Sequence, residues 1–359
     1  MNRAFRRVQC AAALVLFFAC AAPLEAAPWS RTFEGPNYGS LFSLVRSPDG
    51  DVVAVGATNH LHVPPYTGDV LLMSFTLDGD VLWETTWGGS GYEQAWAVAP
   101  APDGGYFVFG ETDSYGAGDR DFFLLKMSSD GTPDWHRTYG AARREWPYGM
   151  LALANGDLLL YGLQTAESGN ARRQFAVRVT STGDVAWEYV RGVANEEIVM
   201  DAVEADDGSL IFCLTINEDG GLAKLAADGS LLWSRRFDIA GWQFPSKIAQ
   251  AEDGFLLAGF ALSPETGGRA DAWLARTTSD GNILWEKAFG DRATDDYATS
   301  LLSLEDGTYL IGALGNGMPL LHVDAEGALL RRPHASVRPL GKRVRSAVGD
   351  DHPGHGGRG

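Results

Sequence analysis

One acidic position recurs along the chain at a fixed distance before a turn. Ten residues ahead of successive Asp-Gly or Asn-Gly turns stand Gly39, Glu93, Glu145, Glu197, Gln243 and Asp296. Carboxylates gathered around one mouth repel one another unless they are paired or neutralised by a cation. Such oxygen ligands suit Ca²⁺. The sequence therefore predicts no obligatory cofactor, and Ca²⁺ is the metal that these side chains would accept.

Aromatic side chains stand close to these positions, namely Tyr92, Trp96, Trp146, Tyr148, Trp242 and Tyr297. Aromatic faces bind cations and sugar rings. We therefore predict a ligand site for a protein, a peptide, a glycan or a cation, built from Glu93, Glu145, Glu197, Gln243, Asp296, Trp96, Trp146, Trp242 and Tyr297. The alternative is that each carboxylate accepts backbone N–H bonds and joins neighbouring repeats, since a position that repeats with a fold usually serves the fold.

No motif in the sequence defines a reaction. Histidines are too few for a Ser-His-Asp triad, and there is neither a Walker-type phosphate loop nor a dinucleotide fingerprint. A metal could be chelated by the His-x-His of His60 and His62 or by Asp350, Asp351, His352 and His355, but surface histidines without a ligand role are commoner. We predict a non-catalytic binding or scaffold module. The alternative is a glycoside hydrolase or lyase that uses paired carboxylates.

The elements that must position these residues are repeated. A tryptophan recurs at Trp29, Trp83, Trp135, Trp187, Trp233 and Trp285, at intervals of 46 to 54 residues, and Arg331 takes the seventh place. From Trp83 on, each of these positions lies four residues after a glycine. Such a period is typical of repeat architectures.

Turn signals divide each repeat into four strands. The dipeptides are Asp49-Gly50, Asp103-Gly104, Asn155-Gly156, Asp207-Gly208, Asp253-Gly254 and Asp306-Gly307, and they favour tight hairpins between apolar runs. In the second repeat we expect strands at 95–101, 106–111, 122–127 and 133–139. Six repeats of four antiparallel strands predict an all-β fold, a six-bladed β-propeller over residues 28–335. The spare strand around Trp29 is predicted to complete the last blade and close the ring.

Two further patterns concern the faces of this propeller. The loops between second and third strands vary in length, which predicts a binding face, and they span Thr58–Gly68, Glu111–Arg120, Leu163–Arg173, Ile216–Gly220, Leu262–Ala270 and Gly315–Gly317. An acid precedes the third strand at Asp69, Asp121, Asp219 and Asp271, and a base follows five places on at Lys126, Arg178, Lys224, Arg276 and His322. We expect these to form a ring of paired charges between blades.

The pattern Asp-Gly-Gly-Tyr, Gly-x-Thr, Asp-x-x-Leu-x-Lys, Gly-x-x-x-Trp and Tyr-Gly resembles the blade repeat of quinoprotein-like propellers and, more closely, that of uncharacterised secreted bacterial propeller proteins. The resemblance covers roughly residues 29–331. It implies the fold and no particular activity. Pyrroloquinoline quinone dehydrogenases carry a vicinal disulfide, which a single mature cysteine, Cys213, cannot supply.

The ends of the chain differ from its body. Residues 1–26 have a basic start and an apolar run, which predicts a signal peptide and a periplasmic or extracellular protein. Phe17–Cys20 vaguely resembles a lipobox, so a lipid anchor on Cys20 is the alternative. Residues 336–359 are basic and rich in Gly and His, which predicts a disordered tail.

Charge and hydropathy exclude some partners. The net charge is −17; residues 1–27 carry +2 and residues 331–359 carry +5, so the body carries −24. This body should repel nucleic acid. No run outside the N-terminus predicts a membrane span, and we expect a monomer.

Overall fold

The structure is a computed structural model that describes residues 39–59, 67–166, 171–192, 196–217, 219–237, 241–262, 268–290, 294–315 and 320–331. These residues form strands and turns, and none of their segments is a helix that could cross a membrane. The predicted signal peptide, the tail, Trp29, His60 and His62 lie outside the described ranges. The all-β prediction is confirmed.

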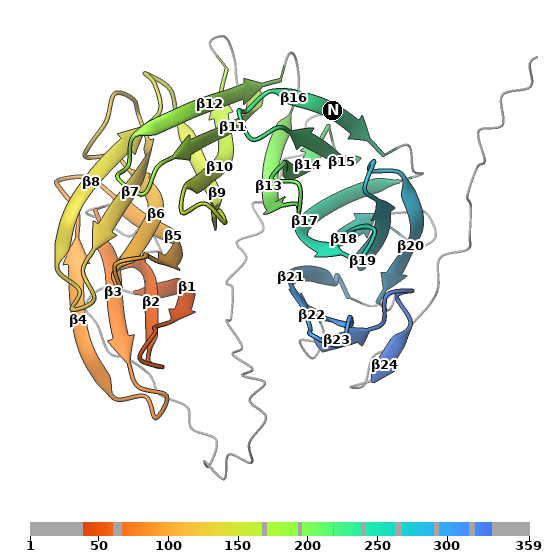
Figure 1. The fold of residues 1–359 in the computed structure, drawn as a ribbon, viewed down its shortest axis with the longest axis horizontal. Coiled ribbons are helices and arrows are strands. Elements are labelled where there is room, and N and C mark those ends of the chain that lie inside the picture. The colour runs from red at the N-terminus through yellow and green to blue at the C-terminus, as the bar shows by residue number, and fades with distance from the viewer. Residues whose placement is uncertain are drawn as a thin grey trace, which may run out of the picture. The chain divides into compact units, whose positions relative to one another are not determined.

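The described residues form six four-stranded antiparallel sheets, in each of which the strands follow the chain order (Figure 1). The first contains β1 (Ser40–Arg46), β2 (Val52–Ala57), β3 (Val70–Phe75) and β4 (Val81–Trp87). The second contains β5 (Glu93–Pro100), β6 (Tyr106–Thr112), β7 (Asp121–Met127) and β8 (Pro133–Tyr139). The third contains β9 (Glu145–Ala152), β10 (Leu158–Thr165), β11 (Arg172–Val179) and β12 (Val185–Arg191).

The remaining three sheets repeat this plan. The fourth contains β13 (Glu197–Glu204), β14 (Leu210–Ile216), β15 (Asp219–Leu225) and β16 (Leu231–Arg236). The fifth contains β17 (Trp242–Ala251), β18 (Gly254–Leu262), β19 (Ala270–Thr278) and β20 (Ile283–Phe289). The sixth contains β21 (Tyr297–Ser303), β22 (Tyr309–Leu314), β23 (Leu320–Val323) and β24 (Leu329–Arg331).

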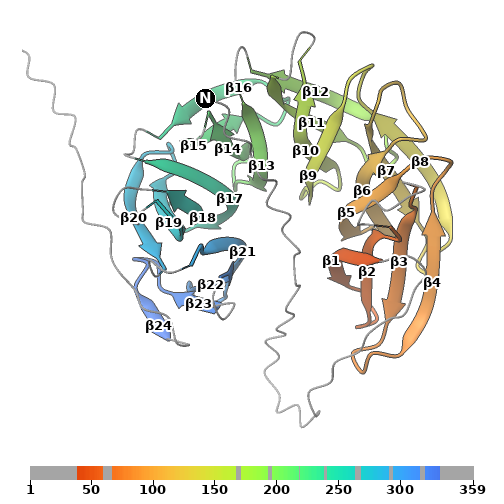
Figure 2. The ribbon, with the colours of Figure 1, turned by 180° about the vertical axis from the view of Figure 1, so that it is seen from behind.

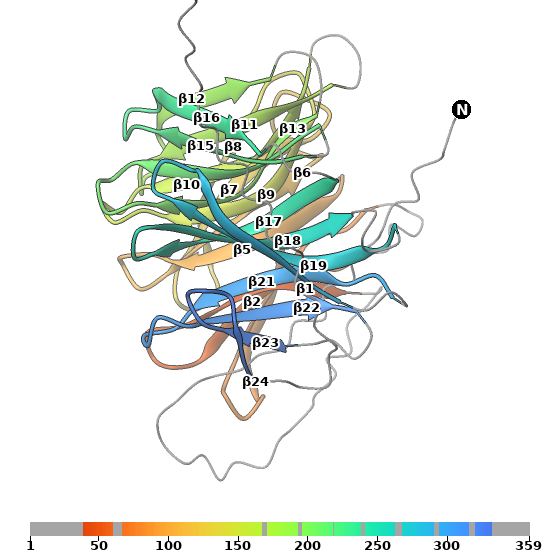
Figure 3. The ribbon, with the colours of Figure 1, turned by 90° about the vertical axis from the view of Figure 1, so that its right-hand side faces the viewer.

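The chain divides into two compact units, and the boundary between them falls within the fourth sheet. The first unit comprises residues 1–212 and 225–232, and the second comprises residues 213–224 and 233–359. In the first unit, β1, β5 and β9 lie on one side and β4, β8 and β12 on the other (Figure 2). In the second unit, β17, β18 and β19 lie side by side in one twisted sheet (Figure 3).

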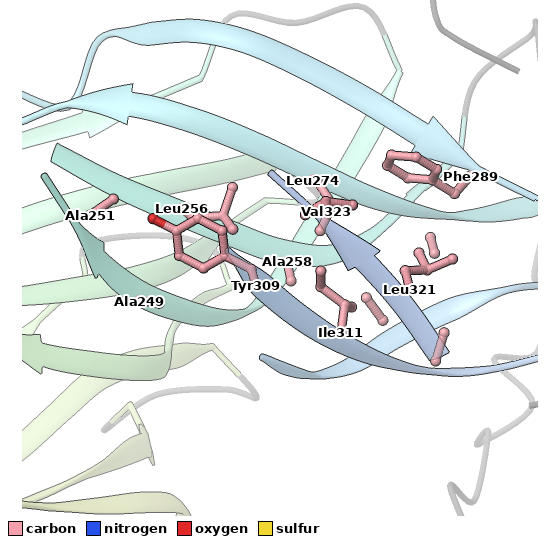
Figure 4. Packing of buried hydrophobic residues seen from close by; sticks show 13 residues of the cluster. Ala249, Ala251, Leu256, Ala258, Leu274, Phe289, Tyr309, Ile311, Leu321 and Val323 are labelled. Atoms are coloured by element: carbon pink, nitrogen blue, oxygen red, sulfur yellow. The ribbon is translucent and has the colours of Figure 1, made fainter. Parts of the chain in front are cut away.

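The core lies between neighbouring sheets. In the first unit, Leu72 of β3 packs with Phe123 of β7, and Phe122 packs with Phe175 of β11. In the second unit, Leu256 and Leu274 of the fifth sheet meet Ile311 of the sixth (Figure 4). Each sheet interior is therefore apolar on both faces, which explains the continuous apolar runs of the second and third strands.

The glycine of the Gly-x-x-x-Trp repeat contacts the tryptophan of the preceding sheet, not the one in its own motif. A Cβ atom on Gly183 would lie 2.9 Å from two ring carbons of Trp135, one sheet earlier in the chain. The same contact pairs Gly131 with Trp83, Gly229 with Trp187, Gly281 with Trp233 and Gly327 with Trp285. All five glycines have φ between 69° and 84°. Glycine is thus required at these positions for two reasons: it readily adopts the positive φ of the turn, and it leaves the space that the indole occupies.

The predicted closing strand around Trp29 lies outside the described residues, and the sixth sheet has a fourth strand of its own in β24. Gly79, the first glycine of this repeat, has a φ of 84°, like the other five. The predicted closure implies that deletion of residues 28–35 abolishes cooperative unfolding, which circular dichroism would follow. A deletion protein that melts at the full-length temperature would refute the closure.

Candidate functional site

The repeated acidic position lies where the first strand of each sheet begins. Glu93, Glu145 and Glu197 open β5, β9 and β13 in the first unit, and Gln243 and Asp296 stand at the start of β17 and just before β21 in the second. The side chains are not open to solvent: Glu93 and Glu145 are 0% exposed, Gln243 is 2% exposed and Asp296 is 6% exposed. Glu197 is half-buried and accepts a hydrogen bond from Gln174 Nε2 at 2.9 Å.

At three of these positions the backbone N–H bonds to the sheet before it. The N–H of Glu93 donates to Gly68 O at 2.7 Å, and that of Glu145 donates to Arg120 O at 2.8 Å. The same bond joins Asp296 to Ala270 O at 2.7 Å. At these three positions the repeated spacing therefore has a structural cause, because it places the residue against the start of the preceding sheet's third strand.

The carboxylate of Glu93 is fully used by the fold. Its Oε2 accepts the N–H of Gly89 at 2.8 Å. Its Oε1 accepts the hydroxyl of Thr112 at 2.7 Å and the N–H of Ser114 at 3.1 Å. Charge-assisted bonds from backbone N–H groups offset the cost of burying the carboxylate. Glu93 thus fixes the two loops on either side of it.

Glu145 has the same place and a different environment. Its Oε1 accepts Gln164 Nε2 at 2.7 Å and the N–H of Ala141 at 3.5 Å. Its Oε2 is buried and has no hydrogen-bond partner in the described part of the chain. Burial, with the nearby Asp121 carboxylate as a smaller cause, raises the pKa of Glu145 to about 7. The side chain is therefore protonated in part at neutral pH.

A second carboxylate faces the first across a glycine. A Cβ atom on Gly140 would lie 2.5 Å from Asp121 Oδ1 and 2.6 Å from Glu145 Oε2. Gly88 stands in the same way between Asp69 and Glu93, and Gly290 between Asp271 and Asp296. Burial and then the Glu93 carboxylate raise the pKa of Asp69. The sequence carried a signal for these carboxyl pairs, since each glycine directly follows the aromatic that ends a fourth strand.

The predicted ring of paired charges is wrong. Lys126 Nζ pairs with Asp103 Oδ2 at 2.8 Å, Arg178 pairs with Asp157 at 2.9 Å, and Arg276 pairs with Asp253. These acids stand at the hairpin between the first and second strands. Asp121 lies at the other end of β7, because five residues of a strand span about 17 Å and side chains five apart point to opposite faces. These three bases therefore brace the hairpin of their own sheet.

The aromatic side chains of the predicted site are more accessible than its acids. Trp96 is 36% exposed, Tyr148 is 36% exposed and Trp242 is 46% exposed. Trp146 is half-buried beneath the guanidinium of Arg144, 4.3 Å from the ring centroid, and Tyr297 is half-buried against Phe260. Tyr92 is buried, and its hydroxyl donates to Gln94 Oε1 at 2.6 Å. A ligand in the first unit would meet Trp96 and Tyr148 before it met Glu93 or Glu145.

Glu111–Arg120 is the one loop of the predicted binding face whose residues are all described. Arg120 lies between Glu111 at 2.8 Å and Asp113 at 2.7 Å. The hydroxyl of Tyr115 donates to Gly88 O at 3.0 Å, and its ring stacks on Trp87 with the centroids 5.4 Å apart. This loop is fastened to the first sheet, which its variable length did not indicate.

Among the described residues no group of three His, Cys, Asp or Glu side chains could hold a metal ion. Each carboxyl pair described above contains only two acids. The histidine pair His60 and His62 lies outside the described ranges. These residues therefore provide no set of ligands for the Ca²⁺ ion that the sequence suggested.

The sequence matches no protein-family model and no curated protein. Solved structures are similar in fold. The WD40 domain of Pan2 from Neurospora crassa has a TM-score of 0.52 at 10% identity, over 80% of this chain and 76% of that one. A Lactobacillus plantarum protein has a TM-score of 0.51 at 13% identity, over 83% and 85%. The dihydro-heme d1 dehydrogenase NirN has a TM-score of 0.50 at 14% identity, over 83% and 57%.

These similarities, at identities of 10–14%, show the fold alone. The chain is a β-propeller, and its six four-stranded antiparallel sheets are consistent with the predicted six blades. A propeller is a scaffold for binding modules and for enzymes alike, so its function has to be argued from its own side chains.

Proposed function

We propose that this chain is an exported, monomeric binding propeller without catalytic activity, related to secreted bacterial propellers with quinoprotein-like repeats. One observation carries the proposal. On the first strands β5 and β9 the acids Glu93 and Glu145 are buried and bonded to the fold, whereas the aromatics Trp96 and Tyr148 are exposed. Exposed aromatic side chains on a rigid sheet are suited to recognition.

The test is a thermal-shift screen of residues 28–359 against glycans, peptides and divalent metals. A ligand that binds only the folded protein raises its melting temperature by mass action. We expect at least one class to give a concentration-dependent rise. A flat response to every class at millimolar concentration would contradict a binding function and leave a purely structural module.

A carbohydrate-active enzyme is the second candidate, and the Asp121–Glu145 pair favours it. Two close carboxyls, one with its pKa raised to about 7, are the groups that acid catalysis needs. Against it, Glu145 is 0% exposed and Asp121 is 1% exposed, so neither reaches a substrate in this conformation. Mass spectrometry of oligosaccharides incubated with the protein distinguishes the enzyme from the binding module. Products that disappear with a folded Glu145→Gln variant would establish the enzyme.

A further inference from the structure

Five of the first strands carry a β-bulge at the same place, three residues after the repeated acidic position. The register shift falls between Leu41 and Ser43 in β1, between Ala95 and Ala97 in β5, and opposite Tyr161 and Gly162 in β9. It recurs between Pro245 and Lys247 in β17 and between Ala298 and Ser300 in β21. The bulged residues are Phe42, Trp96, Tyr148, Ser246 and Thr299. A bulge redirects the side chain that it carries.

The second unit shows what the bulge itself requires. The hydroxyl of Ser246 donates to Ala298 O at 2.9 Å, and that of Thr299 donates to Gly312 O at 3.3 Å. A small hydroxyl side chain that bonds to backbone carbonyls is therefore sufficient for this bulge. The bulge therefore does not require the aromatic rings that stand at the same place in the first unit.

The three aromatics lie on neighbouring strands of the first unit, β1, β5 and β9 (Figure 2). The rings of Phe42 and Trp96 stack with their centroids 5.2 Å apart and their planes 29° from parallel. Trp96 and Tyr148 each keep 36% of their surface exposed. A stacked pair of rings, with a second exposed aromatic on the next first strand, marks a surface that a ligand can cover. We call Phe42, Trp96 and Tyr148 the aromatic platform.

Charged side chains near Tyr148 restrict the chemistry of that ligand. Arg172 Nη1 lies 2.8 Å from Glu196 Oε1. Burial raises the pKa of the Tyr148 hydroxyl, and the charges of Arg172, Glu196 and Glu111 act on that pKa as smaller causes. Arg172 and Glu196 are exposed by 44% and 50%, so both can bond to a ligand. This ion pair presents both signs of charge, so it favours neither a cationic nor an anionic ligand. A neutral ligand with many hydroxyls would find both donors and acceptors here.

We propose that the aromatic platform binds an oligosaccharide. The apolar face of one sugar ring lies on Trp96 and that of another on Tyr148, and the hydroxyls of the second sugar bond to Arg172 and Glu196. This inference rests on the proposed binding function and adds its ligand class. It assigns the repeated carboxylates no contact with the sugar.

Isothermal titration of residues 28–359 with neutral hexaoses of glucose, xylose and N-acetylglucosamine tests the proposal. The variants are Trp96→Ser and Tyr148→Ser, because serine is the residue that this chain uses in the β17 bulge. Ser246→Ala alters the same bulge place in the second unit and is the matched control. We expect a hexaose to bind, each aromatic variant to weaken it about tenfold, and the control to leave affinity unchanged. Circular dichroism should show all three variants folded.

Unchanged affinity in folded Trp96→Ser and Tyr148→Ser proteins would overturn the platform. If no hexaose binds but the screen above finds a peptide or metal, the oligosaccharide proposal falls and the binding function stands. If nothing in the screen binds, both fall.

Discussion

Replacing Glu145 by glutamine is expected to stabilise the protein above pH 7, whereas the same replacement at Glu93 is expected to destabilise it, although both residues occupy the same place in the repeat. In Glu145→Gln the amide oxygen keeps the bonds from Gln164 and Ala141, and the amide N–H₂ takes the place of the partnerless Oε2 beside Asp121. In Glu93→Gln one amide N–H₂ must face an N–H or O–H donor, because both oxygens of Glu93 accept such bonds.

The pH dependence of stability shows why the Glu145→Gln replacement should stabilise the protein. The pKa of Glu145 is raised from 4.5 to about 7 in the folded protein, so the folded state holds a proton that the unfolded state releases between these values. Stability from this group is present below about pH 4.5 and is lost as the pH rises through 7. The ionisation costs about 3 kcal/mol. Wild type and Glu145→Gln should melt alike at pH 4.5, and the variant should melt several degrees higher at pH 8.

Glu93→Gln should lower the free energy of unfolding by about 1–3 kcal/mol, since a buried donor loses its acceptor. Melting curves between pH 4.5 and 8 measure both variants. A Glu145→Gln protein that is less stable than wild type at pH 8 would show that the carboxylate serves the fold as Glu93 does.

Gly183→Ala is expected to be far more damaging than Gly156→Ala, although both glycines are in hairpins of the third sheet. Their φ angles are 83° and 88°, so alanine pays the same left-handed penalty of about 1 kcal/mol at each. The added Cβ would meet nothing within 4 Å at Gly156 but lies 2.9 Å from the Trp135 ring at Gly183. We expect Gly183→Ala to cost about 3 kcal/mol or more in total.

Chemical denaturation of the two glycine variants gives this comparison, and Trp135→Ala combined with Gly183→Ala adds a control. Once the indole is gone, the added methyl meets only Arg137 Cγ at 3.0 Å, in a flexible side chain, so the alanine at 183 should cost little more than the left-handed penalty. Equal losses for Gly156→Ala and Gly183→Ala in the wild-type background would contradict the contact between the hairpin glycine and the tryptophan of the preceding sheet.

The local fold could be predicted well because turn chemistry and alternation act over a few residues. The strand expected at 133–139 is found as β8, and the one expected at 106–111 is β6, which ends at Thr112. The strand expected at 122–127 lies within β7. Such features depend on neighbours in sequence, where Gly, Asp and the apolar runs are decisive.

The candidate site could be located but not understood, because its contacts join residues that lie on different strands and far apart in the sequence. Nothing adjacent to Glu145 in sequence shows that Gln164 bonds to one oxygen while Asp121 faces the other. The partner of Lys126 was mistaken for the same reason, since Asp103 approaches it only across β6 and β7. The bulge at Trp96 also escaped notice, because it depends on the register with β6.

The central claim is that the repeated carboxylates serve the fold while the exposed aromatics serve binding. It is tested most directly by measuring, at pH 5, the affinity of one ligand from the screen for Glu145→Gln and for Trp96→Ser. We predict unchanged affinity for Glu145→Gln and about tenfold weaker binding for Trp96→Ser. The opposite pattern, with binding lost in a folded Glu145→Gln protein and kept in Trp96→Ser, would contradict the claim.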